Sequence, residues 1–378
     1  MSFLTSVGTF WNIVKEVDLN AIRQQATRPL HLVVVGSDGS YSKDIAAQLE
    51  ADPARPLPAT MISVPVVDLH QAAQIDRADL FILVMDAAET QSLEHKELVQ
   101  KWAHKNQQVI VLINHEETGA AVISQAWSSF GRRRVLVGNL QDSKFLHKSL
   151  PHAAMDLLPD QLMALGRHYP FFRVPVAQRL VNETSITNGT YSLSTGLAEV
   201  VPVLGIPVFI TDMIILTKNQ AYLVFKMGMA LGLSTRWQDY VAEFGGVLGA
   251  GFVWRQIARS LVGLIPAWGI VPKVAIAYSG TYVVGNTVLY WYLNGRHVTP
   301  RQMQEFSRHA FARGKEVARS LIRRAPRPQI SRPKTGKRSL TRGKQTCPNC
   351  GKVSARDAQF CQYCGFSFHE KQAEQIQA

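Results

Sequence analysis

Residues 78–87 read ADLFILVMDA, an apolar run with an acidic residue near each end. A short run of this kind indicates a strand that is buried on both faces, as in a parallel sheet covered by helices. Further apolar runs occur at residues 30–35, 60–67, 109–113 and 134–137. Stretches with helical spacing lie between the strands, at residues 42–50, 93–105 and 120–130. Because strands that alternate with helices form parallel sheets, the sequence predicts an α/β domain over residues 29–150.

The first strand runs into a loop with the composition of a phosphate-binding turn. Residues 36–44 read GSDGSYSKD, where a phosphate-binding loop has Gly, four residues, and then Gly-Lys-Ser/Thr. Glycines let backbone N–H groups surround the phosphates, and the lysine reaches the β- and γ-phosphate oxygens. The candidate nucleotide-binding residues here are Gly36, Gly39, Ser42 and Lys43. Ser42 replaces the second glycine, however, and Asp44 replaces the hydroxyl that holds magnesium, so a phosphate would meet a carboxylate.

Three further stretches follow in the order found in GTPases. Asp68, in VVDLHQ at 66–71, takes the place of the Asp-x-x-Gly switch without its glycine, and ADLFILVMDA is very like the strand that follows this switch. Asn114, in INHEE at 113–117, stands where Asn-Lys-x-Asp reads guanine, and Glu117 could accept the guanine donors in place of Asp. Together with the loop, these sites resemble a translation-factor-type or Ras-like GTPase. The resemblance implies a degenerate P-loop GTPase-like sheet, with GTP or GDP and Mg²⁺ as its ligands. Because the chemical residues are replaced, we expect that hydrolysis is lost, and tight nucleotide binding with it.

Other interpretations of these residues stay open. A Gly-x-x-Gly turn after the first strand also serves as a tight strand-to-helix connection in any doubly wound sheet. Asp68 and Asp86, at the ends of strands, could simply cap helices. Two functional interpretations also stay open. The domain could bind nucleotide, or it could act as a divergent GTPase that still uses Lys43, Asp68, Asn114 and Glu117.

Residues 196–295 carry only ten charged residues and predict a hydrophobic helical domain. The longest uncharged run, 274–295, has 22 residues, which is enough to cross a hydrocarbon layer of about 30 Å. Tyr and Trp residues at 290–292 end the run as interfacial anchors do. One membrane span is therefore plausible, and membrane contact is favoured. A soluble bundle is the alternative, since Ser279 and Thr287 would find partners more readily there than in lipid.

Three segments of this region resemble a bacterial domain of unknown function. They are residues 206–231, Leu-Ile-Pro at 264–266, and AIAYSGTYVVG at 275–285. That family is a hydrophobic helical domain found in inner-membrane proteins and fused to GTPase domains. The resemblance implies a location at the inner (cytoplasmic) membrane, with the soluble domains facing the cytoplasm; a cytoplasmic location is the alternative.

The most specific motif lies near the end of the chain. Cys347 and Cys350, then ten residues, then Cys361 and Cys364 form two Cys-x-x-Cys pairs. The two-residue gaps let each pair of thiolates reach one tetrahedral ion, and the glycine after each pair allows a tight turn. The sequence therefore predicts a zinc ribbon whose Zn²⁺ is structural, because four thiolates leave no open position. Ribbons of this kind bind proteins or nucleic acid, and we expect a protein partner.

Charge is distributed unevenly along the 378 residues. The formal net charge is +13, yet residues 323–344 carry nine Lys or Arg and no acid. This segment predicts a disordered basic linker, suited to anionic lipid headgroups or to nucleic acid, or acting only as a solvated tether. All four cysteines lie in the ribbon motif, so we expect no disulfide framework and a reducing setting. The start of the sequence shows no secretory signal.

The complete prediction divides the chain into six parts. They are an amphipathic N-terminal helix at 1–28, the GTPase-like α/β domain at 29–150, a helical connector at 151–195, the hydrophobic helical domain at 196–323, the basic linker at 324–346 and the zinc ribbon at 347–368. The layout predicts a membrane-associated regulatory or scaffold protein whose GTPase-like domain does not hydrolyse GTP; whether the protein is an enzyme, and then a GTP hydrolase, stays open. The alternatives are a divergent membrane-associated GTPase and a soluble nucleic-acid-binding protein.

Overall fold

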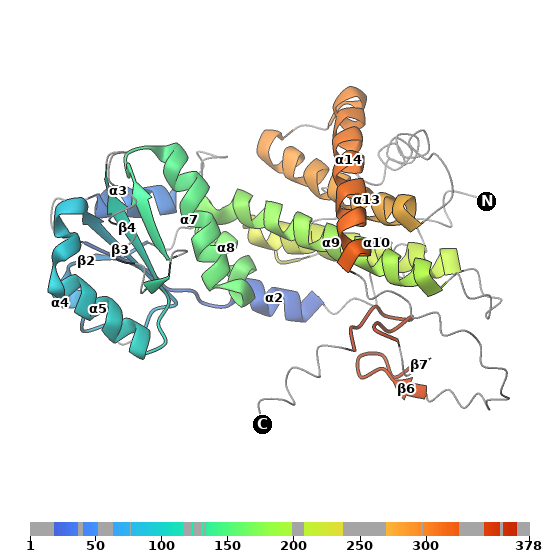
Figure 1. Ribbon diagram of the computed structural model, residues 1–378, viewed down its shortest axis with the longest axis horizontal. Helices are drawn as coiled ribbons and strands as arrows, with labels where there is room; N and C mark the ends of the chain where they lie inside the picture. The colour runs from blue at the N-terminus through green and yellow to red at the C-terminus, as the bar shows by residue number, and fades with distance from the viewer. Residues whose placement is uncertain are drawn as a thin grey trace.

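The structure is a computed structural model of the 378-residue chain (Figure 1). It describes residues 19–36, 41–51, 63–75, 77–115, 123, 127, 130–131, 134–198, 208–236, 270–295, 298–324, 344–355 and 358–368. Most of the N-terminal helix expected at 1–28 lies outside these residues, and only α2 (Leu19–Thr27) belongs to it. The helix expected at 120–130 and the basic linker at 324–346 also lie largely outside them.

Five parallel strands form one sheet, in the order β2-β1-β3-β4-β5. The strands are β1 (Leu32–Val35), β2 (Val66–Val67), β3 (Leu80–Asp86), β4 (Val109–Asn114) and β5 (Val135–Gly138). In the register, Val34 lies opposite both Val66 and Ile82, and Ile82 lies opposite Ile110. The parallel sheet confirms the α/β class predicted from the apolar runs.

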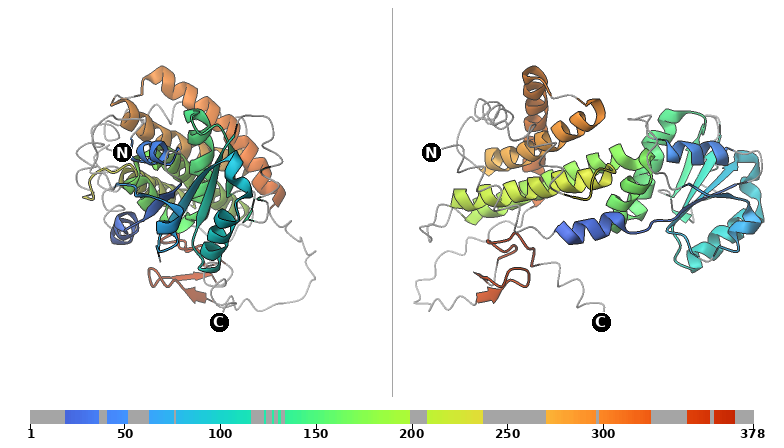
Figure 2. Two further views of the ribbon diagram at one scale, coloured as in Figure 1. Left: turned by 90° about the vertical axis from the view of Figure 1, so that its left-hand side faces the viewer. Right: turned by 180° about the vertical axis from the view of Figure 1, so that it is seen from behind.

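Helices cover both faces of this sheet (Figures 1 and 2). They are α3 (Ser42–Glu50), α4 (Leu69–Ala72), α5 (Leu93–His104) and α7 (Ser143–Leu157). Because successive strand residues point to opposite faces, Val34 and Ile82 pack with residues of α3 and α7. Phe81 faces the other side, where it stacks on Trp102 of α5 with 4.2 Å between ring centroids.

The second half of the described chain is helical. Its elements are η3 (Pro159–Gln161), α8 (Leu162–His168), η4 (Pro170–Phe172), α9 (Arg173–Ala198), α10 (Val208–Ala230), α13 (Ile270–Asn294) and α14 (Pro300–Arg324). In the region of the helical connector expected at 151–195, α7 ends at Leu157, because Leu158 before Pro159 leaves the helical conformation. Helix α9 packs along α10 and α13, and α14 crosses α13 (Figure 1).

Sheet and helices share one hydrophobic core. A continuous cluster of buried apolar side chains runs from Val34 in the sheet through Phe172 and Val181 to Val288 in α13. Helix α7 runs through residue 150 and α9 through residue 195, where the sequence predicts domain boundaries. Helices therefore connect the sheet to the helical part.

The long uncharged run at 274–295 falls in α13, whose polar groups have partners inside the protein. Asn188 of α9 donates from Nδ2 to Thr281 at 2.7 Å, and Ser279 donates to the Ala310 carbonyl of α14 at 3.2 Å. Tyr292 donates to the carbonyl of Leu231 at 3.0 Å. Across the described ranges, the structure contains no helix that is both long and apolar enough to cross a membrane.

Candidate functional site

The first Cys-x-x-Cys pair sits in a tight turn between two short strands. These strands, β6 (Lys344–Thr346) and β7 (Val353–Ala355), pair in antiparallel fashion. The Cys347 carbonyl accepts the N–H of Gly351 at 2.9 Å, and the Cys347 N–H donates to Lys352 at 2.9 Å. Gly351 has a φ of 68°, in the left-handed region that favours glycine. The glycine therefore lets the chain turn back directly after the second cysteine.

The second pair repeats the same turn. The Cys361 carbonyl accepts the N–H of Gly365 at 2.8 Å, and the Cys361 N–H donates to Phe366 at 2.7 Å. Gly365 has a φ of 74°, again in the left-handed region. The two pairs are thus equivalent in their backbone hydrogen bonding, as the sequence spacing predicts.

The two turns bring all four sulfur atoms together. The four Sγ atoms lie within 4.8 Å of one another, with Cys347 and Cys364 3.5 Å apart and Cys350 and Cys361 3.6 Å apart. A tetrahedral Zn²⁺ with Zn–S bonds of about 2.3 Å holds its sulfurs roughly 3.8 Å apart. The four cysteines could therefore hold a metal ion, and their geometry is compatible with structural zinc.

The surroundings of the sulfurs affect how readily each thiol ionises. Burial raises the pKa of Cys361, but the N–H of Tyr363 and the hydroxyl of Ser354, 3.7 Å from the sulfur, outweigh it and lower the pKa to about 6. Burial and the adjacent thiols raise the pKa of Cys364 to about 12, although Asn349 donates to its sulfur at 3.5 Å. Without a cation, four thiolates this close would repel one another, whereas a divalent ion offsets their charge. Asn349 and Ser354 were not singled out from the sequence, because only the fold brings them to the sulfurs.

The cysteine cluster contacts the helices on one side and is exposed on another. Phe360 packs edge-on against Tyr191 of α9, with 6.4 Å between ring centroids. A Cβ atom added at Gly365 would lie 3.7 Å from Ile215 of α10. In contrast, the side chains of Val353 and Tyr363 are 47% and 50% exposed. This small module therefore presents an apolar surface to solvent while it rests on α9 and α10.

The GTPase-like candidates that the structure describes belong to the sheet domain, where three of them lie at the carboxyl ends of the strands. Gly36 directly follows β1, Asp68 follows β2, and Asn114 ends β4, so all three lie at the carboxyl ends of parallel strands. Strand β1 lies between β2 and β3, where the strand order reverses, which is the usual ligand crevice of such sheets. Gly39 and Glu117 lie outside the described residues.

Two of these candidates, Asp68 and Asn114, already have structural roles. Asp68 caps α4 by accepting the Gln71 N–H at 2.7 Å, as the helix-cap interpretation predicted. Asn114 donates from Nδ2 to Asp86 at 3.0 Å and accepts the Leu140 N–H at 3.2 Å. The side chain of Asn114 therefore ties the ends of β3 and β4 to the segment after β5.

The two remaining candidates begin helix α3. Ser42 is buried, whereas Lys43 beside it is exposed. Asp44 lies in the same first turn. A carboxylate therefore accompanies the candidate lysine at the helix start.

No family model, curated protein or solved structure matches this chain. The class that the structure defines is an α/β protein with a five-stranded parallel sheet, a helical second half and a C-terminal cluster of four cysteines.

Proposed function

We propose that this protein is a bacterial regulatory or scaffold protein at the cytoplasmic face of the inner membrane. In this proposal, a non-hydrolysing GTPase-like domain and a hydrophobic helical domain provide its body, and a zinc ribbon recruits its partner. The observation that carries the proposal is the closed set of four sulfurs within 4.8 Å. A metal with four protein ligands has no open position for a substrate, so such a centre stabilises a binding module.

The exposed side of the ribbon suits a protein partner. Tyr363 and Val353 are about half exposed, and the Lys352 ammonium lies 5.0 Å from the centroid of the Tyr363 ring. An accessible aromatic side chain beside apolar and cationic groups is typical of protein interfaces. The residues that contact α9 and α10 are different ones, so the ribbon could bind a partner without leaving the helices.

Among its described residues, the sheet domain departs from the pattern that phosphoryl transfer needs. Such catalysis depends on a positioned lysine, a hydroxyl ligand for Mg²⁺ and a water-orienting group. Here Asp44 stands in place of the hydroxyl beside Lys43. The Asn114 side chain is engaged by Asp86 and Leu140. These features support a domain kept for its shape and binding surface rather than for hydrolysis.

A divergent GTPase is the second candidate, and one observation favours it. Gly36, Asp68 and Asn114 share the carboxyl edge of the sheet at the reversal of strand order, where nucleotides bind in doubly wound folds. If this candidate is correct, the exposed Lys43 would be the group that contacts phosphate.

A calorimetric titration of the zinc-loaded full chain with Mg²⁺ and GTP or GDP separates the two candidates. We expect no binding up to millimolar nucleotide. Micromolar binding that Lys43→Ala abolishes would instead establish the divergent GTPase. Lys101→Ala is the matched control, because Lys101 lies on α5 and its ammonium contacts the Ala73 carbonyl away from the candidate loop.

A further inference from the structure

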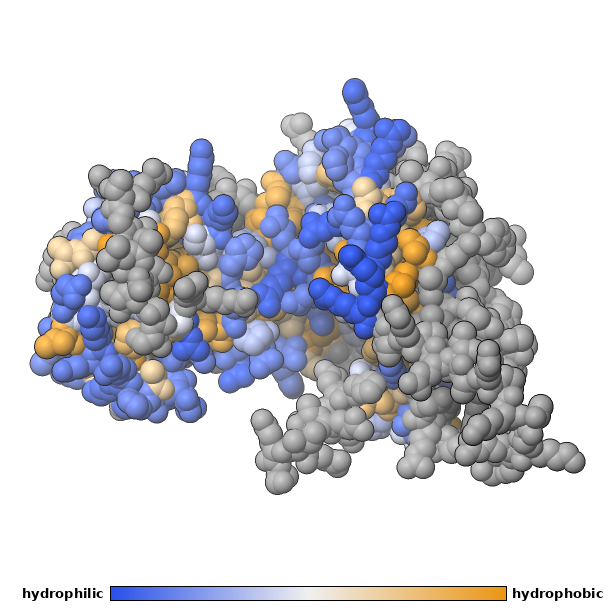
Figure 3. Space-filling model, viewed as in Figure 1, coloured by the Kyte–Doolittle hydropathy of each residue, from blue (hydrophilic) through white to orange (hydrophobic). Residues whose placement is uncertain are grey.

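Helix α14 presents a strongly basic face to solvent. It carries six arginines and one lysine against two glutamates, and all six arginines are exposed. Within the described part of the chain, none of these arginines forms an ion pair. Hydrophilic side chains form a ridge along this helix in Figure 3, with apolar groups beside it. Unpaired cations along one face attract a polyanionic surface.

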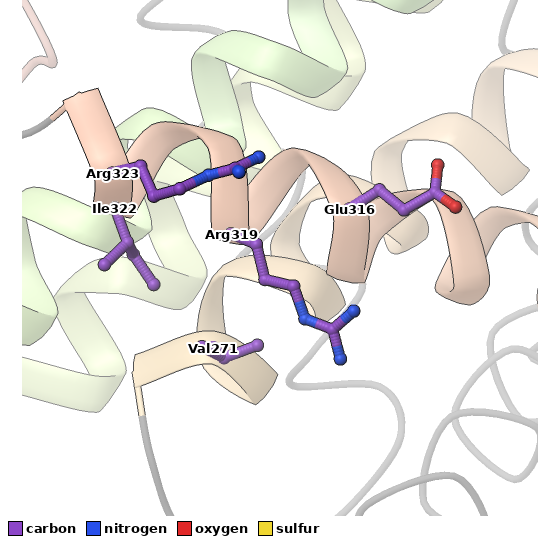
Figure 4. Close-up of a pocket in the computed structure, with 5 residues that line it drawn as sticks. All are labelled: Val271, Glu316, Arg319, Ile322 and Arg323. Atoms are coloured by element: carbon purple, nitrogen blue, oxygen red, sulfur yellow. The ribbon is translucent and has the colours of Figure 1, made fainter.

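A groove lies at the C-terminal end of this face. Its volume is about 520 Å³, and it is lined by Val271, Glu316, Arg319, Ile322 and Arg323. Arg319 and Arg323 are one helical turn apart, so both side chains leave α14 on the same side; in Figure 4 the guanidinium of Arg323 lies along the helix and that of Arg319 extends away from it. In Figure 4 the Arg319 side chain projects toward the first turn of α13, while the Glu316 carboxylate points away from Val271. The Glu316 carboxylate therefore does not neutralise the charge of Arg319 at the end of the groove near α13.

The lining also includes apolar groups. Val271 at the start of α13 and Ile322 of α14 pack against the small buried cluster of Leu193, Val274 and Ala318. A site for a free phosphate needs only charged and polar groups, whereas guanidinium groups beside aliphatic side chains suit a phosphate joined to a hydrocarbon chain. None of the five lining residues is aromatic, and single-stranded nucleic acids generally bind where bases stack on aromatic rings.

We propose that this groove binds the headgroup of an anionic phospholipid. Arg319 and Arg323 contact the phosphate, and Val271 and Ile322 contact the adjoining glycerol and acyl carbons. The proposal rests on the membrane association stated under the proposed function and names the surface responsible for it. The groove opens beside the end of α14, directly before the basic sequence of residues 325–344, so further cations follow it along the chain.

Flotation of the zinc-loaded full chain with lipid vesicles tests the assignment. One set of vesicles is phosphatidylcholine alone, and the other contains phosphatidylglycerol as well. We expect binding only to the second set, with a roughly 30-fold loss for Arg319→Gln/Arg323→Gln, at about 1 kcal/mol for each arginine near a charged surface. The matched control is Arg301→Gln/Arg308→Gln, which removes the same charge from the opposite end of α14 and should lose much less.

Each other outcome has a definite meaning. If wild-type protein floats but both double variants weaken equally, membrane association stands and the groove assignment is wrong, because net charge alone matters. If wild-type protein binds neither vesicle, the groove assignment and the membrane part of the proposed function both fail. If soluble glycerol phosphate competes as strongly as vesicles do, or a nucleic acid duplex binds and vesicles do not, the lipid assignment is overturned.

Discussion

The hydroxyl of Tyr169 accepts the backbone N–H of Leu32 at 2.9 Å. The same hydroxyl donates to the carbonyl of Leu30 at 2.8 Å. Tyr169 directly follows α8, and Leu32 begins β1, so one buried side chain fixes the helical half of the protein to an interior strand of the sheet. The two backbone groups would otherwise lack partners at this position, where burial makes an unpaired polar group costly.

Tyr169→Phe should therefore destabilise the fold. The substitution keeps the ring but leaves the Leu32 N–H and the Leu30 carbonyl unpaired, which we expect to cost about 2 kcal/mol in the free energy of unfolding. Chemical denaturation followed by circular dichroism measures this. Tyr290→Phe is the control, since Tyr290 is partly exposed and only accepts a bond from Gln302 at 3.1 Å. Equal losses of stability for the two variants would show that the hydrogen bonds of Tyr169 to Leu30 and Leu32 contribute no more than the bond at Tyr290.

Tyr169 should also make stability fall at high pH. Burial raises the pKa of Tyr169 to about 12, above the ordinary value of 10. Because the folded state favours the neutral phenol, its contribution is full below pH 10 and is lost as pH rises through 12. The contribution amounts to at most about 3 kcal/mol. We expect the difference in unfolding free energy between wild type and Tyr169→Phe to shrink over this range; a constant difference would contradict the assignment.

Metal removal should unfold the ribbon and leave the five-stranded sheet intact. A module this small has little core of its own, so its folding depends on the ion. We expect one zinc per chain, lost on Cys347→Ser or Cys361→Ser, with faster hydrogen exchange at residues 344–368 only. Val353→Ser should retain the metal, because Val353 is about half exposed and offers the metal no ligand. Full metal retention in both cysteine variants would rule out a four-sulfur site.

The bond from Ser354 to the Cys361 sulfur offers a finer test of the same centre. The Ser354 hydroxyl lies 3.7 Å from the sulfur and helps lower the pKa of Cys361. Removing it by Ser354→Ala should weaken zinc binding by about tenfold, as changes around metal ligands generally do. Competition with a coloured zinc chelator measures the change. An unchanged affinity would mean that the hydroxyl does not act on the thiolate.

Local sequence patterns predicted the strands and the cysteine cluster, because both depend on short spacings. Of the run expected at 60–67, residues 60–62 lie outside the described part of the chain. Among the others only Val66–Val67 form a strand, and Pro65 before them has no N–H to donate to the ladder. Contacts between distant segments were not predictable. Asn114 meets Asp86 only because β3 and β4 pair in a given register, and Asn188 meets Thr281 across 93 positions of the chain.

Helix packing in the second half can be tested at a single glycine. A Cβ atom added at Gly285 of α13 would lie 2.5 Å from a methyl group of Val181 on α9, so one helix must shift. We expect Gly285→Ala to cost about 1–3 kcal/mol, the usual range for overpacking. Gly280→Ala is the control on the same helix, because its Cβ would meet only Gln220 Nε2 at 3.9 Å, and alanine favours helices by up to about 1 kcal/mol. Val181→Ala should rescue Gly285→Ala by removing the methyl groups that clash. If both glycine variants gain stability alike, α9 and α13 do not approach each other this closely.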